Sequence, residues 1–251
     1  MRSKELFDIL HNFNGFHPNM LYNDLIIIDG KDSEFTQEEQ REFIVAYLLY
    51  QQNALTKKHY DRAISNIWKT IEKIDGLAEK LEDLSSSWLD IRGTNATPED
   101  NKLKLYISVD NSDIHYFANK LISKSLEREY DDLDFKINND RTINRRDNVV
   151  IYCNAKTFGK YIEVVEEILQ QNPDLKLNNP HLLSTQYSEH IFVGMDPSDN
   201  KTSHTELISN ALYKGLSNGQ KPEILVQMIE EKLKKDEPEV RALAEVTSSK
   251  K

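Results

Sequence analysis

The residues best suited to acid–base and phosphate chemistry lie in three short segments that alternate apolar and polar positions. The segment 103–109 (LKLYISV) alternates throughout, while 133–138 (LDFKIN) and 148–154 (NVVIYCN) carry a lysine and a tyrosine among apolar neighbours. Because successive side chains of a strand point to opposite faces, the residues between the apolar positions share one face of a sheet. That face is predicted to carry Lys104, Tyr106, Ser108, Lys136, Val150 and Tyr152.

These residue types suit a β-elimination reaction. A lysine that is partly withdrawn from water beside other cations has a lowered pKa, so that its neutral amine can act as a base. Arg145 and Arg146, just before the third strand, could bind phosphate through forked donors at the edge of the same face. A tyrosine hydroxyl can orient a substrate or supply a proton. Together these groups could remove the Cα proton of a phosphorylated Ser or Thr and release phosphate, without a metal or a cofactor.

The same residues also fit a second interpretation. The wet face of a half-exposed sheet ordinarily carries lysine and tyrosine, since tyrosine favours strands and lysine protects edges. From the residues alone, Lys136 is therefore either a solvated strand residue or a base.

The elements around these segments predict an α+β fold. A further strand is expected at 190–195, and helices are expected at about 112–128, 156–171 and 203–217, the last two with apolar stripes. In this order, helices cover one face of an antiparallel or mixed sheet, and the other face is left for a site.

The chain divides into three expected regions. Residues 1–100 read as mainly helical, with helices from a capping box at Thr36 and over 58–84, and one short strand within 21–30 (LYNDLIIIDG). A polar breaker at 92–101 precedes the α+β domain, residues 101–220. Residues 221–251 are expected to form a helix through Leu233 followed by a frayed tail.

Composition narrows the function classes. The 251 residues carry 42 acidic and 32 basic side chains, a net charge of −10, which disfavours binding to nucleic acid or to an anionic membrane. A single cysteine, Cys153, excludes an intrachain disulfide framework and fits a reducing compartment. The beginning of the sequence has no apolar stretch of signal-peptide length, so a cytoplasmic protein is expected. Walker, dinucleotide-binding and HExxH motifs are absent, and no metal site is predicted.

The segments LKLYISV, LDFKIN, INRRDNVVIYC and FVGMDP, followed by a helix, resemble the HopA-type effector family of plant pathogens. Related domains occur in gene clusters for class V lanthipeptides and thioamitides, and the family is similar to the phosphothreonine lyases. The resemblance covers about residues 100–217. It implies a lyase-like α+β domain.

The resemblance also implies roles for particular residues. Lys136 matches the lysine base of the lyases, and Lys104 matches the lysine that opens the first strand's motif. Tyr106 stands where the phosphothreonine lyases have a histidine acid. Tyr152 matches the tyrosine at the end of the third strand.

The expected phosphate ligands match only in part. Arg145 and Asp147 match an Arg-x-Asp pattern. After the turn at 196–197 the family has a Ser-Phe-Gly stretch and then an arginine, whereas His204 or Lys201 occupies that region here. A lost charge-assisted hydrogen bond costs on the order of 1.5–3 kcal/mol, unless a protonated His204 replaces it.

Two functions follow as expectations. The first is a lyase that eliminates phosphate from phosphoserine or phosphothreonine in a precursor peptide of a lanthipeptide-like pathway, working with a partner kinase and a cyclase. The second is a non-catalytic, effector-like or scaffold protein that binds a phosphopeptide or a protein partner. The retained Lys104, Lys136, Arg145 and Tyr152 favour the first, and the lost arginine favours the second.

Overall fold

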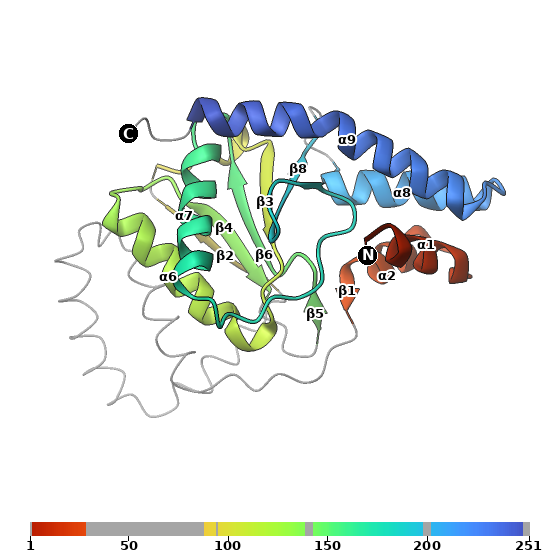
Figure 1. Cartoon of the computed structure of the whole chain (residues 1–251), viewed down its shortest axis with the longest axis horizontal. Helices are drawn as coiled ribbons and strands as arrows, with labels where there is room; N and C mark the ends of the chain where they lie inside the picture. The colour runs from red at the N-terminus through yellow and green to blue at the C-terminus, as the bar shows by residue number, and fades with distance from the viewer. Residues whose placement is uncertain (1, 29–87, 94, 139–142, 198–201, 248–251) are drawn as a thin grey trace.

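The computed structural model describes residues 2–28, 88–93, 95–138, 143–197 and 202–247 (Figure 1). The helices expected from Thr36 and over 58–84 lie outside these described residues.

A six-stranded sheet forms the centre of the molecule, and every pair of neighbouring strands in it is antiparallel. Its order is β2-β4-β6-β3-β8-β7, so strands distant in sequence become neighbours. The strands expected at 103–109, 133–138, 148–154 and 190–195 are confirmed within one or two residues. The strands are β2 (Trp88–Arg92), β3 (Leu103–Ile107), β4 (Asp134–Asn138), β6 (Val149–Cys153), β7 (Thr185–Gln186) and β8 (Ile191–Met195).

Helices α6 (Ile114–Glu127) and α7 (Phe158–Gln171) cover the first face of the sheet (Figure 1). Apolar side chains from alternate strand positions, such as Phe135 and Ile151, are fully buried against apolar residues of these helices, such as Phe117. This packing confirms the predicted α+β class and the expected helical stripes.

The second face is covered over only part of its width. Helices α1 (Arg2–Asn12), α2 (Pro18–Ile26), α8 (His204–Ser217) and the first part of α9 (Pro222–Thr247) share an apolar cluster with Leu182 and Leu183. Beside this cluster, Tyr106 and Phe192 on β3 and β8 are buried. The prediction of a free second face therefore holds only toward β2, β4 and β6, where Lys136 and Tyr152 stay partly exposed.

The strand expected within 21–30 is mostly helix. Pro18 stands in the first turn of α2, and His17 Nδ1 accepts a hydrogen bond from the backbone N–H of Asn19. Leu21 and Leu25, one turn apart, are fully buried. Within the described residues 21–28, β1 (Ile27–Ile28) alone is extended, and it pairs with β5 (Asn144–Arg145).

The last helix is longer than expected. Instead of fraying after Leu233, α9 continues to Thr247 with Pro238 inside it. A proline inside a helix costs about 3 kcal/mol. The extension nevertheless buries Val240 and Ala244 in the core that contains α7, and this burial opposes the cost. Among the described residues, no helix is both long and apolar enough to cross a membrane.

Candidate functional site

The strand register lines up the predicted site residues across the second face. Asp90 on β2 lies opposite Lys136 on β4, and Lys136 lies opposite Val150 on β6. On the next strand pair, Tyr152 lies opposite Lys104. As the alternation predicted, two lysines and a tyrosine therefore share this face.

Lys136 stands among aromatic rings and other cations. Its Nζ atom is 4.3 Å from the centroid of the Trp88 ring and 5.8 Å from that of Tyr152. Within the described part of the chain it has no ion-pair partner. Burial lowers the pKa of Lys136, and the charges of Lys104 and Arg145 lower it further, against the opposing effects of Asp147 and Asp90. A neutral amine is thus more accessible here than on a solvated lysine.

Lys104 is buried and paired. Its Nζ atom lies 2.7 Å from Oδ2 of Asp196 and 5.5 Å from the centroid of the Tyr152 ring. The other oxygen of Asp196 accepts a hydrogen bond of 2.8 Å from the backbone N–H of His204, at the start of α8. Asp196 therefore connects the lysine to the N-terminus of this helix.

Arg145 lies against the Trp88 ring, which Lys136 also contacts. Its Nε and Nη2 atoms donate to the two oxygens of Asp147 at 2.8 and 3.3 Å, and its guanidinium is 4.9 Å from the centroid of Trp88. Burial opposes the charged form, but Asp147 and a hydrogen bond with Tyr22 raise the pKa of Arg145 above its ordinary value. Arg145 is therefore a fixed cation that contacts the same indole ring as Lys136.

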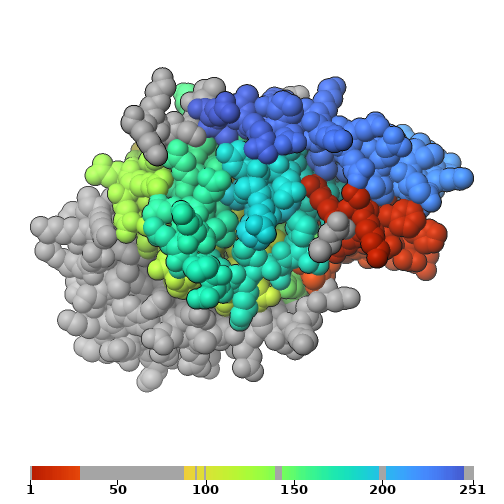
Figure 2. All heavy atoms as spheres, viewed as in Figure 1, coloured from red at the N-terminus to blue at the C-terminus, as the bar shows by residue number. Residues whose placement is uncertain are grey.

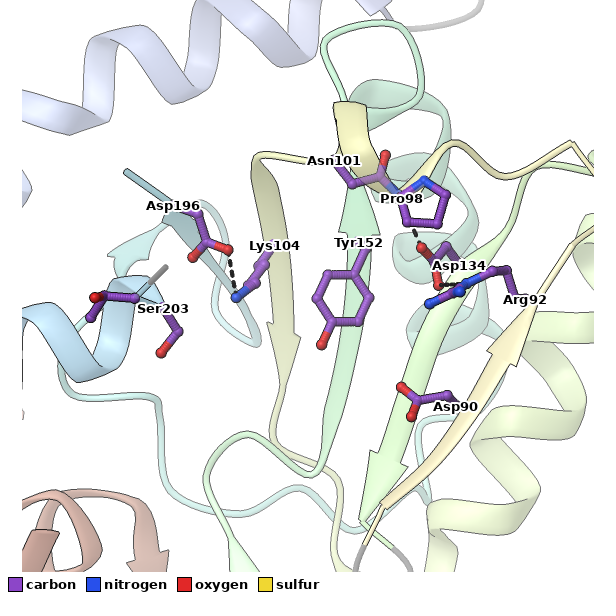
Figure 3. A pocket seen from close by; sticks show the side chains of 10 residues that line it. Asp90, Arg92, Pro98, Asn101, Lys104, Asp134, Tyr152, Asp196 and Ser203 are labelled. Carbon is purple, nitrogen blue, oxygen red and sulfur yellow. Dashed lines mark hydrogen bonds and ion pairs between the residues drawn. The ribbon is translucent and has the colours of Figure 1, made fainter. Parts of the chain in front are cut away.

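A cavity of about 410 Å³ lies next to Lys104 and Tyr152 (Figure 3). Lys104 and Tyr152 line it, and the two ion pairs Lys104–Asp196 and Arg92–Asp134 lie on opposite sides of the tyrosine ring. Burial raises the pKa of Tyr152, so its hydroxyl keeps its proton at neutral pH. The full lining is Asp90, Arg92, Pro98, Asn101, Lys104, Asp134, Tyr152, Asp196, Thr202 and Ser203.

Tyr106 lies in the packed part of the face rather than on this cavity. Its ring stacks on His181 with centroids 4.4 Å apart, and its hydroxyl accepts a hydrogen bond from Thr205 Oγ1 at 3.4 Å. Only 3% of Tyr106 is exposed, and burial raises its pKa well above the ordinary value. Neither Tyr106 nor Lys136 is among the residues that line the cavity.

His204 and Arg146 do not line the cavity either. The His204 ring is buried, with Nδ1 3.1 Å from the carbonyl oxygen of Met195 and Nε2 2.9 Å from that of Leu183. Burial lowers the pKa of His204, which disfavours the protonated form that could replace an arginine. Arg146 points away from the cavity toward α1, where its Nη2 atom is 2.5 Å from Oε1 of Glu5.

Several residues at or beside the site escaped the sequence analysis, among them Trp88, Asp90 and Tyr22. Trp88 and Asp90 come from β2, whose segment 88–92 (WLDIR) alternates apolar with polar or aromatic positions and could have been read as a strand. Tyr22 comes from α2, and no local signal connects it to Arg145. No group of three or more His, Cys, Asp and Glu side chains within the described ranges is arranged to hold a metal ion.

Comparisons with known proteins match the fold. No protein-family model and no curated protein match the sequence. A solved effector protein from Pseudomonas syringae pv. tomato strain DC3000 is similar at a TM-score of 0.58 and 14% identity, covering 92% of each chain. An effector from Pseudomonas syringae pv. syringae strain 61 is similar at 0.53 and 14%, covering 88% of this chain and 96% of its own. The chain thus shares the fold of these two solved proteins, and the likeness extends beyond residues 100–217.

Proposed function

We propose that this protein is a lyase that eliminates phosphate from phosphoserine or phosphothreonine in a peptide. The observation that carries the proposal is Lys136. It is a half-buried amine with a lowered pKa and no ion-pair partner among the described residues, and it lies beside two further cations. A base for carbon acids needs this combination of accessible neutral amine and nearby positive charge.

In the proposed reaction, neutral Lys136 takes the Cα proton of the phosphorylated residue. The electron pair of the broken C–H bond forms the Cα=Cβ double bond, and the Cβ–O bond breaks. Phosphate leaves with the bridging oxygen and the electron pair of that bond. Arg145 and Lys104 stabilise its negative charge, since both are cations on the same face as the base. The reaction balances without an oxidant, a metal or a cofactor.

The cavity beside Tyr152 supports a peptide as the substrate. At about 410 Å³ it has room for a few side chains but not for a folded domain. We propose that a partner kinase supplies the phosphorylated peptide, and that the dehydroamino acid is consumed by a cyclase that adds a thiol to it.

A second candidate function is binding of a peptide or protein partner without turnover. The observation in its favour is that Asp196 and Asp147 already pair with Lys104 and Arg145. A phosphate group must compete with these carboxylates for both cations. If they do not release the cations in the bound state, the leaving phosphate is poorly stabilised.

Mass spectrometry of a synthetic phosphothreonine peptide incubated with the protein separates the candidates. Elimination leaves a peptide that has lost phosphoric acid and carries an alkene, which a small thiol then labels. A peptide that co-elutes with the protein but is recovered with its phosphate intact refutes the lyase and supports the binding module. Recovery of the free threonine peptide indicates hydrolysis and refutes both.

A further inference from the structure

Arg146 is a buried cation whose partners come from distant parts of the chain. Only 4% of the residue is exposed. Its Nη2 atom pairs with Glu5 on α1, and its Nη1 atom donates to the carbonyl oxygen of Pro180 at 3.2 Å. Its Nε atom has no hydrogen-bond partner in the described part of the chain. Glu5 is thus its one carboxylate partner among the described residues.

The same short segment also carries Arg145, on its opposite side. Arg145 ends β5 and faces the Trp88 ring, while Arg146, the first residue of the turn that follows, faces α1. The backbone is held from the N-terminal side as well. Ile27 on β1 pairs with Arg145 on β5, and the N–H of Arg146 donates to the carbonyl oxygen of Ile26 at 2.9 Å.

Helix α1 is itself anchored near its first residues. The Nε and Nη2 atoms of Arg2 donate to the carbonyl oxygen of Leu182 at 3.0 and 2.9 Å, and Nη2 also contacts that of Ser184. Its guanidinium lies 5.8 Å from the centroid of Phe192 in the sheet. In Figures 1 and 2 the N-terminal helices lie against α8 and α9 at one end of the molecule. Glu5 is therefore presented to Arg146 by a fixed element.

We propose that Glu5 is a positioning residue for the candidate phosphate ligand Arg145, and that it acts through Arg146. The role of Arg145 rests on the proposed function; its placement by Glu5 does not. Without Glu5, the guanidinium of Arg146 is buried without a counter-charge, which is strongly unfavourable. The segment 144–147 relaxes by turning Arg146 toward water, and this movement withdraws Arg145 from Trp88.

The fluorescence emission of Trp88 reports this movement, and its measurement does not require any enzymatic activity. The chain has two tryptophans, so Trp68→Phe leaves Trp88 as the only one. In that background, Glu5→Ala changes the emission of Trp88, because the guanidinium of Arg145 leaves the indole ring. Asp8, one turn along α1, is exposed and lines the same cavity as Arg146, but among the described residues it makes no ion pair with it. Asp8→Ala therefore removes an equal charge and leaves the emission unchanged.

Affinity for inorganic phosphate is the second readout. The dissociation constant, measured by calorimetry, rises about tenfold in Glu5→Ala, which corresponds to about 1.4 kcal/mol, and stays unchanged in Asp8→Ala. Glu5→Ala combined with Arg146→Met removes the stranded charge along with its partner, so both the emission and the affinity return toward the wild-type values. If Glu5→Ala does not fold, the Trp88 emission and the phosphate affinity of Glu5→Gln are measured instead.

Equal emission and equal phosphate affinity in folded Glu5→Ala and Asp8→Ala overturn the inference. A double variant that binds phosphate more weakly than Glu5→Ala also overturns it, because Arg146 is then itself a phosphate ligand. A wild-type protein that binds phosphate but eliminates none from a phosphopeptide refutes the lyase and leaves the role of Glu5 standing. If the wild type binds no phosphate, the Trp88 emission alone decides for or against Glu5.

Discussion

The Nζ atom of Lys136 lies 4.3 Å from the centroid of the Trp88 ring, across the edge pair of strands β4 and β2. The guanidinium of Arg145 contacts the same ring. One indole thus holds the candidate base and a candidate phosphate ligand together while it shields both from water. Burial at this position lowers the pKa of Lys136, and the charges of Lys104 and Arg145 lower it further, whereas a fully solvated strand lysine would keep its ordinary pKa.

Replacing the amine tests its role in chemistry. Lys136→Ala is expected to lower kcat by about 10²–10⁴-fold, the usual contribution of a general base. Its melting temperature should stay near that of the wild type, because the partly exposed side chain leaves no core cavity. Lys136→Arg keeps the charge but cannot deprotonate, so it should be equally inactive. An active Lys136→Arg would show that only charge is needed at this position.

The pH dependence of kcat/KM tests the electrostatics around Lys136. Because only the neutral amine is a base, kcat/KM should rise with pH through a pKa below the ordinary 10.5. Lys104 lowers and Asp90 raises the pKa of Lys136, so Lys104→Met should move this rise to higher pH and Asp90→Asn to lower pH. If the rise of kcat/KM shifted in the same direction along the pH axis in both variants, the assignment of Lys136 as the base would be contradicted.

Packing at Gly194 tests the covered part of the second face. A Cβ atom at this position would lie 2.8 Å from the Tyr106 ring and 2.9 Å from that of His204. Gly194→Ala is therefore expected to lower the free energy of unfolding by about 1–3 kcal/mol, as overpacking does. Urea denaturation measures the change. An unchanged midpoint would mean that the two rings are not packed as described.

Two buried histidines predict loss of stability in acid. Burial lowers the pKa of His181 and of His204 below the ordinary 6.5, so the unfolded chain binds these protons more readily than the folded one. Their contribution is complete above pH 6.5 and falls as the pH drops below it, by up to about 1.4 kcal/mol per pH unit for each histidine.

Urea unfolding between about pH 7.5 and about pH 5.5 measures this loss. His181→Gln should flatten the dependence, whereas the control His190→Ala, at a partly exposed site, should not. Equal slopes in wild type and His181→Gln would contradict the expectation.

Alternation predicted the shared face of Lys104, Lys136 and Tyr152, because a strand's side-chain period is local to its own sequence. Apolar stripes likewise predicted α7 and α8. Both signals depend on neighbours only a few residues away.

The rest depends on contacts between distant segments. Tyr106 is buried because His181 stacks on it, and the burial of Arg146 depends on Glu5, 141 residues away. No local sequence pattern in residues 143–148 or in helix α1 indicates the pairing of Arg146 with Glu5. For the same reason, the extension of α9 past Pro238 could not be read from its polar tail, since its cause is the core that it reaches.

The most direct test of the account follows the Cα hydrogen itself. A phosphothreonine peptide with deuterium at Cα is incubated with the protein, and the product is weighed by mass spectrometry. The account predicts that the product loses phosphoric acid together with the deuterium, more slowly than the protium peptide reacts, and that Lys136→Ala yields none. A dephosphorylated product that keeps its deuterium, or a peptide recovered unchanged, would contradict elimination by Lys136.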